Sequence, residues 1–249
     1  METPPGAVRG ANNDPTVPAP APEQASVVED FIDIFHAPST VFARREKGGY
    51  GMQLLIVALL SALFAFANRS VIMQIFDAEF QRGVEKAMAA NPRITQDMMN
   101  TQRGISEGIA SFAGYIGTPI FIFILALFVW LAAKIVSGKV TYGQAVMITT
   151  LAWIPRLVGS LLTTLQVVLM DTTNVTNMFS VSYSPARFMD VDATNPKLFG
   201  ILGSLDLFGI WCTVLMGIGI SVMGKVPRSR GYAAAAMVFV IGVIPALFR

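Results

Sequence analysis

Charged residues are scarce in this sequence. Only 14% of the 249 residues are Asp, Glu, Lys or Arg, whereas 53% are hydrophobic. An ordinary soluble domain is about 25% charged, so this chain carries more apolar surface than water would tolerate. We therefore expect an integral membrane protein whose solvent is the lipid bilayer.

The residue types that build catalytic and metal sites are also scarce. The one cysteine, Cys212, excludes an internal disulfide, and the one histidine, His36, excludes a histidine-based metal cluster within one chain. The segment from Gly219 to Val226 nearly matches a phosphate-binding loop, but Val226 replaces the Ser or Thr that would hold magnesium. We therefore predict no metal, no cofactor and no catalytic residue, and we expect that the chain is not an enzyme.

A concentrated charge of either sign is missing too. The formal net charge is +2 and the basic residues are scattered, so no positive stripe could follow a phosphate backbone, and nucleic acid is not an expected partner. The first residues have no apolar stretch behind a basic start, which excludes a cleaved signal peptide. Residues 1–24 instead predict a disordered polar cytoplasmic tail.

Long apolar runs, by contrast, are abundant in residues 25–249. A helix rises about 1.5 Å per residue and must cross about 30 Å of hydrocarbon. The runs long enough to do so are residues 50–67, 112–136, 143–170, 198–223 and 232–248. The predicted fold class is therefore all-α, a polytopic membrane bundle with five transmembrane helices. Residues 76–109 predict an outer helical hairpin, divided at Asn91-Pro92.

Basic residues near the spans indicate the orientation, because Lys and Arg resist translocation. Arg44, Arg45 and Lys47 stand just before the first span, where we expect them to meet anionic headgroups. The short turns after the second and fourth spans are basic as well; their residues are Lys134, Lys139, Lys225, Arg228 and Arg230. We therefore place the amino terminus in the cytoplasm.

Several short segments, taken in order, resemble a known family. They are Asp33-Ile-Phe-His-Ala-Pro38, Thr141-Tyr-Gly-Gln144, Trp153-Ile-Pro155, Leu205-Asp-Leu-Phe-Gly-Ile-Trp211 and Gly231-Tyr-Ala-Ala-Ala-Ala. From about Val28 to its end, the chain resembles the Yip family of five-span, Ypt/Rab-interacting membrane proteins in its bacterial form. The resemblance implies a five-span helical bundle in a bacterial inner membrane. It implies a small GTPase partner only for a eukaryotic protein.

Two predicted spans contain one internal charge each, Arg156 in the third and Asp206 in the fourth. A charge near the centre of a membrane helix costs at least about 2.5–3.5 kcal/mol, so both should point into the bundle. Steps of three and four residues place small and polar residues on the same faces. The predicted intramembrane polar cluster consists of Arg156, Asp206, Pro155, Ser160, Thr163, Gly209 and Thr213.

This cluster has two interpretations. Arg156 and Asp206 could pair, although they lie at different depths, and the carbonyl groups freed by Pro155 offer Arg156 another partner. A single carboxylate without a second titratable group makes a poor proton relay. We therefore favour a structural network that fixes helix register over a substrate, ion or proton site.

Two functions follow from these observations. The first is a non-enzymatic scaffold or accessory factor for membrane organisation or transport, whose partners are other membrane proteins or a transport complex. The alternative is a small channel or carrier with a polar path at Arg156 and Asp206. A polar cavity that is open to one face and reaches Arg156 would favour transport, whereas a dry, closed bundle would favour the scaffold.

Overall fold

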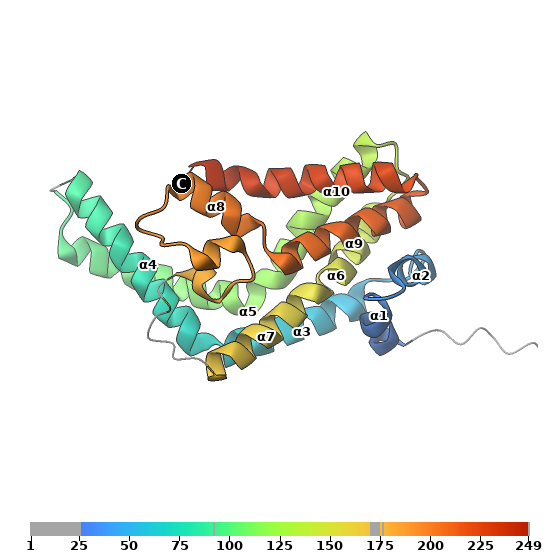
Figure 1. The fold of residues 1–249 in the computed structure, drawn as a ribbon. Helices are drawn as coiled ribbons and strands as arrows, with labels where there is room; N and C mark the ends of the chain where they lie inside the picture. The colour runs from blue at the N-terminus through green and yellow to red at the C-terminus, as the bar shows by residue number, and fades with distance from the viewer. Residues whose placement is uncertain (1–25, 92, 170–174, 176, 249) are drawn as a thin grey trace, which may run out of the picture.

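The computed structural model describes residues 26–91, 93–169, 175 and 177–248. The predicted disordered tail, residues 1–24, lies outside them. In the described part of the chain all regular structure is helical, and no strand is present. The main bundle (Figure 1) is made of α3 (Gly51–Ala67), α5 (Gln96–Ile135), α6 (Tyr142–Ala152), α7 (Ile154–Leu169), α9 (Leu207–Gly224) and α10 (Arg228–Val243).

The structure contains four or five candidate membrane spans, which confirms the all-α membrane fold class. Four spans are long and apolar enough by themselves: Phe112–Ile135, Tyr142–Leu169, Leu207–Gly224 and Arg228–Phe248. The fifth requires α3 to be joined with α4 (Arg69–Ala90), from which it is bent by 70°. α3 has only 17 residues, so it covers slightly less than the hydrocarbon thickness by itself.

The core lies along α6 and α9. Every residue from Ala145 to Ala152 is buried. The share of buried residues is 67% in the span that contains α6 and 61% in α9, but only 28% in the spans of α5 and α10. Because bilayer-facing side chains need no protein cover, α5 and α10 are expected to form much of the lipid-facing surface.

The predicted fourth span, residues 198–223, differs from the structure because it is not one helix. α8 (Pro196–Ser204) ends first, and α9 begins at Leu207 with Asp206 as its N-cap. Aspartate favours this cap position over a helix interior because its carboxylate accepts hydrogen bonds from the first free amides. Asp206 therefore marks the start of the membrane-crossing helix instead of lying within it.

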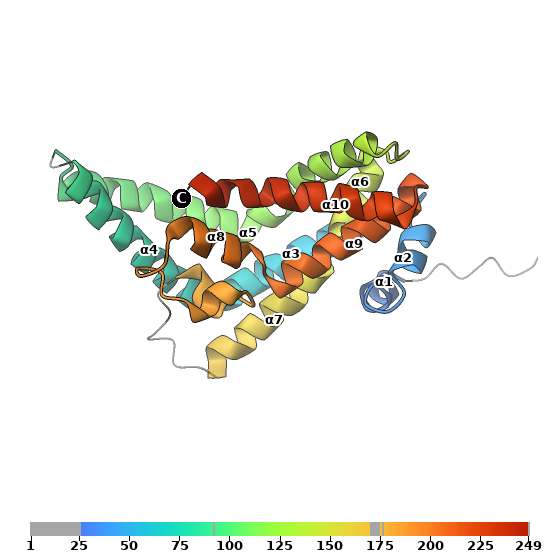
Figure 2. The same ribbon diagram turned by 45° about the horizontal axis from the view of Figure 1, so that its top comes forward.

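The expected outer hairpin, residues 76–109, also has different bounds. α4 follows α3 almost directly, and α5 is one helix of 40 residues that continues into the second span. We call α4 together with residues 96–111 of α5 the arm. Figures 1 and 2 show the arm projecting from the bundle, at the left of both views.

Two short helices precede the first span, α1 (Val27–Asp33) and α2 (Pro38–Arg44). Asp30 is fully buried between them, and its carboxylate accepts hydrogen bonds from Arg44 Nε at 2.7 Å and Arg45 Nε at 2.6 Å. Burial by itself would lower the pKa of Arg44, but its hydrogen bonds to Asp30 and Asp33 raise it overall. The two arginines expected at the headgroups therefore hold α1 against α2.

Candidate functional site

Arg156 lies in the first turn of α7, just after the chain changes from α6 to α7 at Trp153. The Trp153 amide donates to the carbonyl of Thr150, and the Arg156 amide donates to that of Trp153. Pro155 has no amide hydrogen and is buried at this junction, which explains the local departure from regular α-helix. The junction brings the Arg156 guanidinium carbon to 5.1 Å from the centre of the Trp153 ring.

Trp153 and Arg156 both line two neighbouring cavities. The larger one, which we call the polar cavity, has a volume of about 490 Å³ and lies among α3, α4, α5, α7 and the segment 178–183. The smaller one, the apolar cavity, has a volume of about 220 Å³ and lies among α5, α6, α9 and α10. Arg156 is exposed, so its guanidinium faces open space although α7 packs within the bundle.

The walls of the polar cavity include groups that lack hydrogen-bond partners. Ser61 Oγ and Asn68 Oδ1 are buried, and neither has a partner in the described part of the chain. The amide nitrogen of Asn68 is satisfied, because it donates to the carbonyl of Phe64 and to Thr164 Oγ1. A buried polar atom without a partner costs about 1–3 kcal/mol, so a donor that reached either oxygen would stabilise it.

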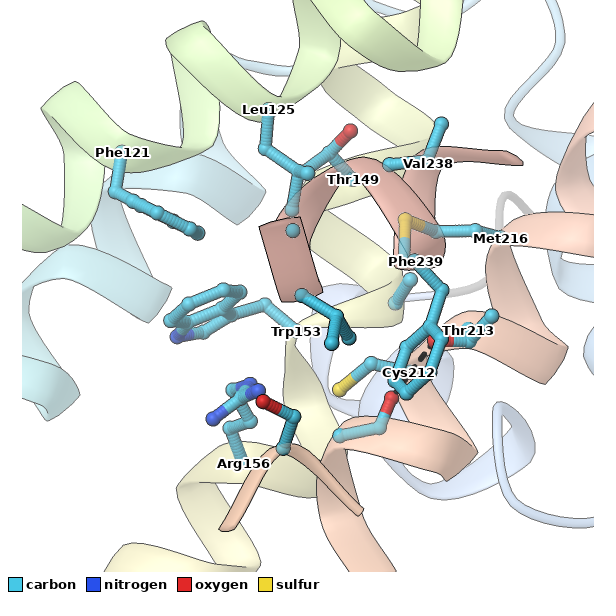
Figure 3. Close-up of a pocket in the computed structure, with 15 residues that line it drawn as sticks. Phe121, Leu125, Thr149, Trp153, Arg156, Cys212, Thr213, Met216, Val238 and Phe239 are labelled. Carbon is cyan, nitrogen blue, oxygen red and sulfur yellow. Dashed lines mark hydrogen bonds between the residues drawn. The ribbon is translucent and has the colours of Figure 1, made fainter. Parts of the chain in front are cut away.

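The apolar cavity has a different lining. Its aromatic and aliphatic walls, shown in Figure 3, include Phe121, Leu125, Met216, Val238 and Phe239. Its hydroxyl groups already donate within their own helices: Thr149 to Ala145, Ser204 to Gly200 and Thr213 to Gly209. Arg156 is the one charged residue among those that line it.

Arg156 and Asp206 are neighbours, but they form no ion pair in the described part of the chain. Asp206 accepts hydrogen bonds from the amide of Gly209 at 3.0 Å and the amide of Tyr183 at 3.1 Å. A Cβ on Gly209 would stand 3.0 Å from Arg156 Nη2, so the glycine leaves room for the guanidinium. The direct pair considered from the sequence is not observed, because the carboxylate caps α9 and binds the amide of Tyr183.

The stacked tryptophan does not compensate the charge of Arg156 fully. A cation–π contact contributes about 0.5–2 kcal/mol, which is less than the cost of about 2.5–3.5 kcal/mol for an arginine near the centre of a membrane helix. The difference must come from more distant charges, from water or from a bound anion. The guanidinium presents donors in a planar fork that matches a carboxylate or a phosphate.

The structure divides the residues of the predicted cluster between the two cavities. Arg156, Ser160, Thr163 and Asp206 line the polar cavity, and Arg156 also lines the apolar cavity with Gly209 and Thr213. Pro155 is buried and is not among the residues that line either one.

Sequence reasoning missed Trp153 as the contact of Arg156, although a spacing of three residues on a helix was an available signal. It also missed Ser61 of α3 and Asn68 at the junction of α3 and α4, both of which line the polar cavity. In the described part of the chain, no three His, Cys, Asp or Glu side chains are placed to hold a metal ion together.

Comparison with known proteins gives two matches. The model of the Yip1 domain matches residues 32–248. The membrane protein YknW of Bacillus subtilis (strain 168) is 26% identical over 220 residues, which cover 86% of this chain and 87% of that protein. No solved structure matches the chain.

Proposed function

The chain belongs to the Yip1 domain family of membrane proteins, and we propose that it is a non-enzymatic carrier or binding protein that receives an anionic group at Arg156. The observation that supports this proposal is the position of Arg156. Its guanidinium has no ion pair among the described residues, yet it borders a cavity of about 490 Å³. Asp206 serves as a structural cap and is not part of the binding group.

The charge of Arg156 has to be compensated within the membrane. A cation that has no ion pair and is not fully stabilised by its aromatic contact gains from an anion or from water, because the neighbouring carboxylate of Asp206 is already engaged by the amides of Gly209 and Tyr183. The polar cavity has far more room than the about 30 Å³ that one water molecule occupies. Charge attraction would therefore concentrate anions at Arg156 whenever the cavity is open to water.

The proposed site would be reached from one face of the membrane. With the amino terminus in the cytoplasm, as the basic residues near the spans favour, the segment 178–183 lies on the outer side. This segment lines the polar cavity, so we propose that solutes reach Arg156 from the outer face. The bacterial relative supports a bacterial cytoplasmic membrane as the location.

Cysteine accessibility tests the proposal. In a Cys212→Ala background, Ser160→Cys places a thiol in the polar cavity, one helical turn from Arg156. We expect the anionic reagent methanethiosulfonate ethylsulfonate to react about tenfold faster than its cationic trimethylammonium analogue, since about 1.4 kcal/mol of attraction changes a rate tenfold. Adding Arg156→Gln should remove this preference.

The matched control is Leu161→Cys in the same background. Leu161 is adjacent in the chain and has an exposed side chain on α7, which would face lipid if it does not line the cavity. In lipid vesicles the thiol of Leu161→Cys should therefore react with neither charged reagent. If Ser160→Cys proves as inert as Leu161→Cys, or if it shows no preference for the anionic reagent, the proposed function is contradicted.

Scaffolding is the second candidate function, and the arm is the observation that favours it. The arm projects from the bundle (Figure 1) and exposes Met98, Ile105 and Ile109, which other membrane proteins or a transport complex could contact. The same labelling experiment separates the two functions. An inert Ser160→Cys would mean a dry, closed bundle and would favour the scaffold.

A further inference from the structure

We infer that the molecule received at Arg156 is an anionic lipid or fatty acid, whose headgroup contacts Arg156 and whose chain occupies the apolar cavity. This inference rests on the proposed function and adds the chemical class of the ligand. It starts from the shared position of Trp153 and Arg156 in the walls of both cavities. Polar and apolar space therefore meet at the one guanidinium.

The lining changes character across this meeting point. On one side lie Ser61 and Asn68, with polar atoms that lack partners among the described residues. On the other side, the hydroxyls of Thr149, Ser204 and Thr213 are all engaged by carbonyl groups of their own helices. A ligand with a charged head and an apolar tail would match both sides, whereas a small hydrophilic anion would match only the first.

Two residues that line the apolar cavity, one on α5 and one on α10, are themselves exposed. Phe121 of α5 lines it and is 48% exposed. Gly242 of α10 lines it as well, and a Cβ built there would meet nothing within 4 Å. Because α5 and α10 belong to the least buried of the four spans that qualify by themselves, an acyl chain that leaves the cavity between them would enter the bilayer.

The size of the apolar cavity fits part of an acyl chain. An apolar cavity of about 150 Å³ is known to take up a benzene molecule. The volume of about 220 Å³ therefore accommodates a somewhat longer segment of hydrocarbon, and the rest of the chain would leave between α5 and α10 into the bilayer. The anionic head is required because Arg156 is the charged residue that borders this space.

Binding of oleate to the purified full-length protein tests the inference, with native mass spectrometry as the measurement. We expect one oleate per chain. Oleate should bind at least about tenfold more tightly than methyl oleate or oleoyl lysophosphatidylcholine, and a tenfold difference in affinity corresponds to about 1.4 kcal/mol of binding free energy. Arg156→Gln should remove this preference for the anion. Acetate, which has the head without the chain, should not compete at concentrations that saturate oleate.

Two glycine substitutions isolate the role of the apolar cavity. Gly242→Leu should obstruct the space between α5 and α10 and weaken oleate binding about tenfold. Gly83→Leu on α4, where a new Cβ likewise meets nothing within 4 Å, should leave the binding unchanged. Unaltered thermal unfolding of both variants would show that they fold. If oleate binds Gly242→Leu and the wild type equally, or if acetate displaces oleate, the inference is overturned. The proposed function is tested separately, by the anion preference of Ser160→Cys.

Discussion

Arg156 occupies a position in which three neighbours have distinct physical roles. Trp153 offers the face of its ring, Gly209 leaves the space that a side chain would fill, and Pro155 interrupts the regular helix just before the charge. The sequence predicted that Arg156 and Asp206 would face the interior, because lipid penalises a charge. It did not predict that the carboxylate would serve the start of α9, since hydropathy alone treats residues 198–223 as one apolar run.

A pair of substitutions at Asp206 separates its capping role from attraction to Arg156. Asp206→Ala should lower the free energy of unfolding by about 0.5–2 kcal/mol, because it removes the cap bond to Gly209. Asp206→Asn should cost less, because the amide oxygen of asparagine still caps the amide of Gly209, although its nitrogen cannot accept from the amide of Tyr183 as Asp206 Oδ2 does. Unfolding in mixed detergent micelles measures both. Equal losses for the two variants would contradict the capping role.

Among the helices, the closest packing joins α9 to α10. A Cβ on Gly231 would overlap the carbonyl oxygen of Gly217 and stand 2.9 Å from the Cβ of Ser221. Small residues permit such close approach, which is a main source of helix association in lipid. The sequence showed where the apolar helices lie, but not which pairs would approach most closely. The break before α9 could have been predicted, because an aspartate just before an apolar run is a recognised helix start.

The matched pair Gly231→Ala and Gly242→Ala tests this packing within one helix. Gly231→Ala should lower the free energy of unfolding by about 1–3 kcal/mol, because the backbone of α9 must move to admit a methyl group. Gly242→Ala should be neutral or stabilising by up to about 1 kcal/mol, since no atom lies within 4 Å of the new Cβ. If Gly231→Ala is as stable as Gly242→Ala, α9 and α10 do not pack closely at Gly231.

At the scale of the whole molecule, composition and apolar runs were sufficient to predict an all-α membrane bundle. The predicted site could be located only in part, because Ser61 and Asn68 join Arg156 at the polar cavity from a part of the chain that is distant in sequence. The two cavities themselves have no sequence signature, since each is space left among helices that individually read as ordinary apolar spans.

An experimental structure of the protein in lipid nanodiscs is the most direct test of the central claim, that Arg156 attracts an anion inside the bundle. We expect non-protein density against the guanidinium, continuing between α5 and α10, while Asp206 still caps α9. A closed bundle in which Arg156 is paired directly with Asp206, and no density other than protein lies beside it, would contradict the account.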